Sequence, residues 1–241
     1  MNNAIRQGFL AVNHTAFLMP EEYSGANIFY RVSDLTYDAQ LFFLMVDLQE
    51  KDASPEMWAR SLDTFLHDQQ LTLPPGALKM RWISNHDTVS WTFQKARPAK
   101  VYGVAKLRAL WAMCAFIPGV PMLYQGDENP AVYGGNGVNN VDYLTQIYRL
   151  RNHHDVLSIG DANYTEIKAT GGVFTCVRKM KNELAIVLIS FNNQPIKSRI
   201  TSPESLTGEW ADALSGEKIH VANGQSISMK PYQVRTLFLA H

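Results

Sequence analysis

The sequence has few cysteines, no excess of charge of one sign and no long apolar run. Its 241 residues contain two cysteines, Cys114 and Cys176, which lie far apart within apolar patterns and outside any Cys-x-x-Cys or other ligand-like spacing. This spacing argues against a metal site built on thiolates. We expect both thiols to be buried and free, because unpaired cysteine is among the most buried residue types.

The charge balance and the hydropathy pattern exclude two further classes of protein. Lys plus Arg and Asp plus Glu each number 22, so the formal net charge is zero, and no run of basic residues occurs. A dedicated nucleic-acid binder needs such residues to neutralise phosphates. The most apolar stretch, residues 110–124, is interrupted by Pro118, Gly119 and Pro121 and is shorter than the roughly 18 residues that indicate a membrane span. The first residues lack the pattern of a signal peptide, and the compartment is left open.

The pattern up to residue 156 is typical of an α/β protein, with apolar strand-like runs alternating with longer helix-like stretches. We expect helices over residues 4–12, 100–117 and 141–151, and another that begins at Pro55 after the cap residue Ser54. We expect strands over residues 17–19, 78–83 and 120–124, and a short strand that leads into a helix within residues 30–48.

The pattern from residue 157 onwards is typical of an all-β protein. Short apolar runs are separated by turns rich in Gly, Asn, Pro and Ser, with no helix between them, at residues 173–177, 184–191, 226–229 and 234–239. We therefore predict two domains, residues 1–156 and residues 157–241, of which the second is a small antiparallel β-sandwich.

Acidic or imidazole side chains follow three of the predicted strands in pairs: Glu21 and Glu22, His86 and Asp87, Asp127 and Glu128. The carboxyl ends of parallel strands carry the adjustable loops of such folds, so reacting groups collect there. Paired carboxylates suit general acid catalysis on a neutral polyhydroxylated substrate. The alternative for each pair is a helix cap or a solvated loop residue, and for Asp127 and Glu128 it is that they brace the last loop.

Four segments together resemble the α-amylase family, glycoside hydrolase family 13. Residues 80–88, Met-Arg-Trp-Ile-Ser-Asn-His-Asp-Thr, resemble the segment that ends its seventh barrel strand, and residues 118–128 resemble its eighth. Residues 150–157 are similar to the last barrel helix of the family. Residues 210–216 and 229–234 are similar to the closing strands of its C-terminal domain. The resemblance implies the second half of a (β/α)8 barrel followed by a β domain.

The resemblance also implies roles for individual residues. Asp87 matches the carboxylate that grips sugar hydroxyls at the cleavage point, with Asn85 and His86 beside it as substrate-binding residues. Glu21 matches the general acid and base at the end of the fifth strand. We prefer it to Glu22 because it directly follows the apolar run and Pro20.

Two aromatic residues near these segments, Trp91 and Tyr124, are candidates for stacking on sugar faces. Plain packing is the alternative, since aromatic side chains favour burial. We expect no cofactor and no metal ion.

The sequence also departs from the family. Retaining glycosidases need a nucleophile about 5 to 5.5 Å from the acid. The family supplies it from a Gly-Phe-Arg-x-Asp-like segment on the fourth strand, and no such segment precedes Glu21. The Asn-bearing third-strand motif is absent too, so about four of the eight βα units of a barrel are expected. Alone, the chain is expected to be inactive.

The predicted function is therefore part of a retaining hydrolase of α-glucosidic linkages, with an α-linked oligosaccharide or polysaccharide as its ligand. The open half barrel is explained by a truncated or interrupted product, by a separate chain that supplies the first half, or by a second copy. The alternatives are a noncatalytic carbohydrate-binding or scaffold protein and an α-glucan transglycosylase.

Overall fold

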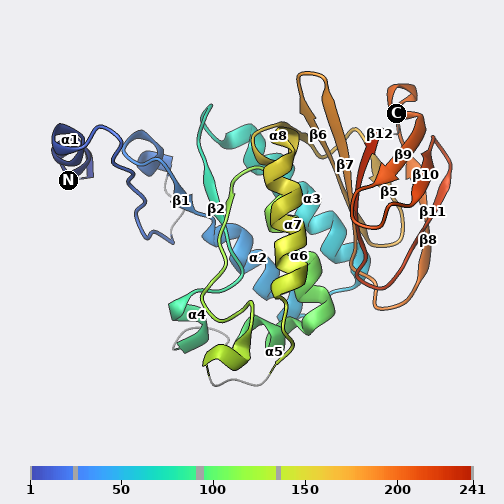
Figure 1. The fold of residues 1–241 in the computed structure, drawn as a ribbon, viewed down its shortest axis with the longest axis horizontal. Helices are drawn as coiled ribbons and strands as arrows, with labels where there is room; N and C mark the ends of the chain where they lie inside the picture. Colours follow the sequence, from blue (N-terminus) through green and yellow to red (C-terminus); the bar gives the residue numbers. More distant parts are fainter. Residues whose placement is uncertain (1, 24–26, 91–94, 134–136, 240–241) are drawn as a thin grey trace.

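The computed structural model describes residues 2–23, 27–90, 95–133 and 137–239 (Figure 1). Within these ranges the first part of the chain is mainly helical around a small parallel sheet, and the second part is antiparallel β structure. No helix in the described ranges has the length and apolar character needed to cross a membrane.

The parallel sheet has the order β1-β2-β3 and consists of β1 (Thr36–Tyr37), β2 (Lys79–Arg81) and β3 (Val120–Pro121). β2 is buried at all three positions, as expected for the middle strand. β1 and β3 each have one neighbour, so the described sheet ends in two open edges.

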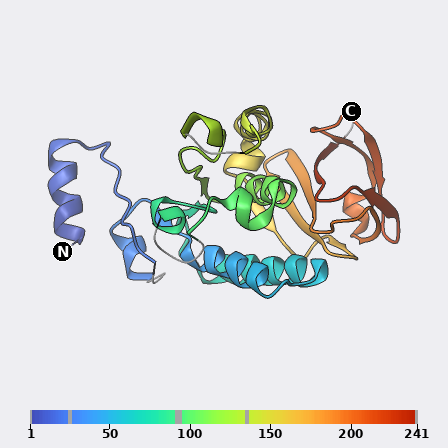
Figure 2. The ribbon, with the colours of Figure 1, turned by 90° about the horizontal axis from the view of Figure 1, so that it is seen from below.

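The described helices of this part are α1 (Asn2–Val12), α2 (Ala39–Glu50), α3 (Pro55–Thr72), α4 (His86–Ser90), α5 (Pro98–Tyr102), α6 (Val104–Phe116), α7 (Val141–His153) and α8 (Asp155–Ser158). α2 and α3 connect β1 to β2, α4, α5 and α6 connect β2 to β3, and α1 stands apart from the sheet (Figure 2). The 3₁₀ helices η1 (Asn27–Arg31), η2 (Pro130–Tyr133) and η3 (Glu204–Leu206) lie in the connections. α3 begins as its sequence predicts, because the Ser54 side chain accepts a hydrogen bond from Met57 N at 3.2 Å and Pro55 occupies the first turn.

The second part contains a six-stranded sheet, β10-β9-β12-β7-β6-β4, and a three-stranded sheet, β11-β8-β5. All of their strand pairs are antiparallel. The strands are β4 (Asp161–Asn163), β5 (Lys168–Ala169), β6 (Val173–Met180), β7 (Glu183–Ser190), β8 (Ile196–Thr201), β9 (Gly208–Asp212), β10 (Lys218–Val221), β11 (Ser226–Met229) and β12 (Val234–Leu239). Side chains from both sheets contribute to one apolar core cluster.

A second and larger core cluster joins the two parts of the chain. It contains side chains of α2, α3, α6 and α7 together with Cys176 and Val187 from the six-stranded sheet. Trp58 on α3 stacks on Phe191, which directly follows β7, with ring centroids 5.4 Å apart. The predicted burial of both free cysteines is confirmed.

Three of the sequence-based element predictions need correction. Residues 17–19 form no strand, and the helix predicted over residues 100–117 is divided into α5 and α6 at Gly103. Gly103 has φ 73° and ψ 151°, a backbone conformation that is essentially confined to glycine. The strand predicted over residues 120–124 is limited to β3, whose Val120 is exposed rather than buried.

Candidate active site

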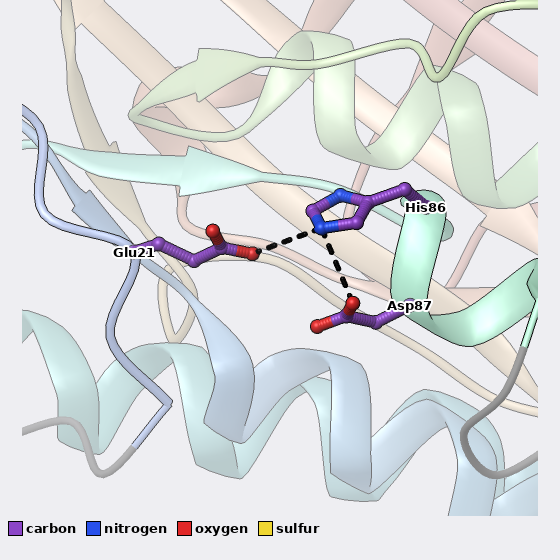
Figure 3. A group of neighbouring side chains, drawn as sticks. All are labelled: Glu21, His86 and Asp87. Carbon is purple, nitrogen blue, oxygen red and sulfur yellow. Dashed lines mark ion pairs between the residues drawn. The ribbon is translucent and has the colours of Figure 1, made fainter.

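Three of the side chains singled out in the sequence meet at the end of β2: Glu21, His86 and Asp87 (Figure 3). His86 Nε2 lies 3.7 Å from Glu21 Oε1 and 3.2 Å from Asp87 Oδ1. The possible ligand atoms of the three residues all lie within 4.8 Å of one another, so their chemistry suits a metal ion as well as a polar substrate. Residues 65 positions apart in the sequence thus form one polar cluster.

The local sequence after β2 explains how His86 and Asp87 are presented. They are the first two residues of α4, and the preceding Asn85 forms its cap. Asn85 Oδ1 accepts a hydrogen bond from Thr88 N at 3.0 Å, and Asn85 N donates to Thr88 Oγ1 at 3.0 Å. This reciprocal pair is equivalent to a capping box and fixes the first turn of α4. The structure therefore gives Asn85 a structural role in addition to its predicted place at the substrate.

Tyr23 connects the segment that carries Glu21 to this turn, and the sequence reasoning missed it. Its hydroxyl donates to Asp87 Oδ2 at 3.1 Å and accepts from Asn85 Nδ2 at 2.5 Å. Its ring lies against Tyr37 and Trp82, with centroid distances of 5.7 and 6.0 Å. Burial raises the pKa of Tyr23 to about 12, and the neighbouring Asp87 acts in the same direction. Tyr23 is therefore a neutral hydrogen-bond donor at ordinary pH.

The three clustered side chains differ in their access to solvent. The side chain of Asp87 is 14% exposed, whereas those of Glu21 and His86 are 47% and 57% exposed. Asp87 Oδ1 is buried and makes no hydrogen bond, although His86 Nε2 is close to it. The side chains of Glu21 and His86, which are more exposed than that of Asp87, are therefore the ones open to a ligand.

A separate polar cluster follows β3 and contains two other predicted residues. Asp127 accepts a hydrogen bond from the Ser84 hydroxyl, and Arg97 Nη1 lies 3.1 Å from Asp127 Oδ1. Burial raises the pKa of Asp127, against the lowering effects of Ser84 and Arg97. The Arg97 guanidinium also lies over the Tyr124 ring, 5.1 Å from its centroid. These contacts brace the loop after β3, which is the structural alternative that the sequence left open for Asp127.

The structure does not test the prediction for Trp91, which lies outside the described residues. Glu128 contacts its own loop, because its Oε2 accepts a hydrogen bond from Gly126 N at 2.8 Å. Of the predicted catalytic and substrate-binding residues, the structure thus brings together Glu21, His86 and Asp87 directly, and Asn85 through Tyr23.

Comparisons with known proteins agree with this architecture, although no family model matches the chain. The chain is 24% identical to neopullulanase 2 from Thermoactinomyces vulgaris over 199 residues, which are 75% of this chain and 33% of that protein. The maltogenic α-amylase AmyB from Thermotoga neapolitana superimposes with a TM-score of 0.78 at 17% identity, covering 99% of this chain and 58% of AmyB. The α-amylase of Geobacillus thermoleovorans, solved in complex with acarbose, gives 0.74 at 15% identity and covers 100% of this chain and 57% of that enzyme.

The chain therefore has the fold of the α-amylases that it matches, and the resemblance to α-amylases seen in the sequence is confirmed. Its described helices and sheets correspond to the C-terminal portion of that fold. The chain spans a third of the length of neopullulanase 2 and somewhat more than half of the length of the two solved enzymes.

Proposed function

We propose that this chain contributes the acid/base carboxyl and a substrate-gripping carboxylate to a retaining glycosidase that acts on α-glucosidic linkages. The convergence of Glu21 and Asp87 on His86 carries this proposal. In this reaction Glu21 protonates the glycosidic oxygen of the leaving sugar and later accepts a proton from the attacking water. Asp87 and His86 hold sugar hydroxyls, and the grip of Asp87 strengthens as the oxocarbenium-like transition state forms.

The proposed site needs a nucleophilic carboxylate in addition to Glu21 and Asp87. Double displacement requires a nucleophilic carboxylate about 5 to 5.5 Å from the acid. No Gly-Phe-Arg-x-Asp-like segment precedes Glu21, so we expect no hydrolysis from these 241 residues alone. We assign β1, β2 and β3 to the second half of a barrel (residues 1–156), and residues 157–241 to a C-terminal β-sandwich. A polypeptide with the first half of the barrel, rather than a second copy, would supply the nucleophile.

Two features of the described residues support an incomplete barrel. The parallel sheet has open edges at β1 and β3, where strands of a complementing polypeptide would pair. On α1, the side chains of Ile5, Phe9 and Val12 are exposed, although such residues favour burial. A complementing half would cover both features.

A second candidate function is sugar binding without turnover. The exposure of Glu21 and His86 favours it, because these side chains can hold a sugar hydroxyl whether or not a nucleophile is present. Transglycosylation would use the same groups, with a sugar in place of water as the acceptor. In each case the ligand is an α-linked glucan, as suggested by the acarbose complex of the Geobacillus enzyme.

The test combines calorimetric titration with maltotriose and acarbose and a turnover assay on malto-oligosaccharides. We expect saturable binding and no turnover, with binding weakened by Asp87→Asn. Glu21→Gln should weaken the binding of maltotriose, whereas Glu22→Gln, its matched control, should leave the binding unchanged, and this difference distinguishes the two adjacent carboxylates. Turnover by the chain alone would contradict the missing nucleophile. Absence of binding to either sugar would remove the carbohydrate function.

A further inference from the structure

Asp34 joins three parts of the structure that are separate in sequence. Its carboxylate receives two hydrogen bonds from Arg6 on α1, Nη1 to Oδ2 at 2.7 Å and Nη2 to Oδ1 at 2.8 Å. Oδ2 also accepts from Leu18 N at 2.8 Å, and Asp34 N donates to Leu18 O at 2.9 Å. The Asp34 side chain thus binds the α1 helix. The side chain and the backbone of Asp34 both bind the segment that carries Glu21.

The segment around Glu21 depends on such contacts because it has no regular structure. Residues 16–22 belong to no helix or strand. Leu18, three residues before Glu21, is fixed by Asp34, and Tyr23, two residues after it, is fixed by Asp87 and Asn85. Met19 packs against the core cluster around Trp82. Glu21 is therefore held between two hydrogen-bonded anchors, one at Asp34 and one at Asp87.

The anchor at Asp34 also connects Glu21 to α1. Figures 1 and 2 show α1 standing apart from the other helices and from the sheet, and its Ile5, Phe9 and Val12 are exposed. None of the core clusters of the described residues includes these apolar side chains. The two parallel bonds from Arg6 to Asp34 have the fork geometry that fixes orientation as well as distance.

We propose that Asp34 is a positioning residue for Glu21, and that it makes the place of Glu21 depend on the place of α1. This inference rests on the proposed role of Glu21 as the acid and base. A polypeptide that engages the exposed face of α1 would then act on the proposed acid through Arg6, Asp34 and Leu18. Asp34 touches no reacting atom itself.

The test measures the proximity of positions 21 and 86 without any sugar chemistry. Glu21→Cys and His86→Cys are combined, and the pair is treated with dibromobimane, which becomes fluorescent when it bridges two close thiols. The native thiols will not compete, because burial raises the pKa of Cys114 and of Cys176 to about 12. We expect rapid bridging in this double variant.

Asp34→Ala removes both side-chain contacts, and Arg6→Gln removes the link to α1 alone. Each is expected to slow bridging by about five-fold or more, because five-fold is the factor that corresponds to a single net hydrogen bond and each variant removes more than one. Asp47→Ala is the matched control, because Asp47 is a carboxylate with a cationic partner, Lys51 Nζ at 2.7 Å, on the exposed face of α2. It should leave the rate unchanged.

Each result of the bridging experiment either supports or overturns the positioning role of Asp34. Bridging at the parent rate in Asp34→Ala and Arg6→Gln would overturn it, as would a lack of bridging in the parent pair. If Asp34→Ala fails to fold by circular dichroism, Arg6→Gln carries the test, since Arg6 is partly exposed on α1. If the parent protein does not bind sugar, the proposed function is overturned. If the parent protein binds sugar and bridging is unchanged in Asp34→Ala and Arg6→Gln, only the role of Asp34 is overturned.

Discussion

The Tyr23 hydroxyl donates a hydrogen bond to Asp87 Oδ2 at 3.1 Å, and this bond connects the segment that carries Glu21 to the first turn of α4. The same hydroxyl accepts a hydrogen bond from Asn85. A single phenol thus fixes two of the proposed substrate-binding groups relative to each other, from a segment that has no regular structure of its own.

Replacing Tyr23 by Phe removes this hydroxyl and leaves the ring in place. The Asn85 amide then loses an acceptor and Asp87 loses a donor, at a net cost of about 1 kcal/mol for each hydrogen bond. We expect the affinity for maltotriose, measured by calorimetric titration, to fall about five-fold or more for this reason. Tyr30→Phe is the control, because the described contact of Tyr30 is between its ring and Lys79. Equal affinities for the parent and Tyr23→Phe would remove Tyr23 from the site.

A buried ion pair between Arg81, the last residue of β2, and Asp38, which directly follows β1, is expected to dominate local stability. Arg81 Nη1 contacts Asp38 Oδ2, and the side chains are 4% and 0% exposed. Asp38 also accepts from Gln69 Nε2 at 2.9 Å. Asp38→Ala leaves the Arg81 charge buried without its partner and should lower the free energy of unfolding in urea by about 3 to 5 kcal/mol.

The exposed pair between Asp47 and Lys51 provides the comparison for that measurement. Surface pairs contribute about 0 to 1 kcal/mol, so Asp47→Ala should change the unfolding free energy little. Similar losses for Asp38→Ala and Asp47→Ala would show that burial does not govern the contribution of the Asp38 pair.

The contacts of Asp34 also predict a pH dependence. The hydrogen bonds from Arg6, and then that from Leu18 N, hold the pKa of Asp34 below its ordinary value. A carboxyl with a lowered folded pKa stabilises the fold above its unfolded value of about 3.9, and this contribution is lost as the pH falls through the folded pKa. The amide resonance of Leu18 should therefore titrate with a midpoint below about 3.9.

Arg6→Gln removes the largest cause of that lowering and should move the Leu18 midpoint upward. A midpoint in the parent protein at or above the usual carboxyl value would contradict the bonding of Asp34. The experiment is a series of nitrogen–proton correlation spectra, and it needs neither sugar nor a partner chain.

The turn before β6 approaches α3 closely at Gly172. A Cβ atom there would lie 2.4 Å from Pro55 Cβ, and Gly172 has φ 73°. Gly172→Ala is therefore expected to combine backbone strain with a steric clash. Gly76→Ala is the control, since Gly76 has φ 78° and nothing within 4 Å of the added atom. The left-handed backbone alone costs roughly 1 to 2 kcal/mol for a residue with a Cβ, so Gly172→Ala should exceed Gly76→Ala in thermal destabilisation.

The sequence predicted those features that depend on local chemistry. The Ser54 cap and Pro55 predicted the start of α3, and the residues 84–88 predicted a polar turn after β2. The position of Glu21 beside His86 followed from the resemblance to family 13. By contrast, β4 and β5 were missed because they are only three and two residues long, and β8 and β10 were missed because they carry few apolar residues. β9 was indicated only by the family resemblance of residues 210–216.

Other features required the three-dimensional arrangement. The bond from Tyr23 to Asp87 joins residues 64 positions apart, and no local pattern marks Tyr23 as a partner of that carboxylate. Residues 17–19 have the composition of a strand, but a strand needs a neighbour, and in the described structure Leu18 pairs with Asp34 alone. The periodicity of residues 100–117 continues through Gly103, whose backbone conformation nevertheless ends one helix and begins the next.

The core cluster shared by α3, α6 and the six-stranded sheet bears on how such a chain can evolve. The Trp58 ring stacks on Phe191, and the buried Arg178 of β6 donates to the Phe116 carbonyl oxygen, so both interactions cross the boundary predicted at residues 156 and 157. A recombination event that exchanged residues 157–241 for those of a distant relative would leave the Trp58 ring and the Phe116 carbonyl group without their counterparts. The two regions are therefore expected to be inherited together, as a single unit of selection.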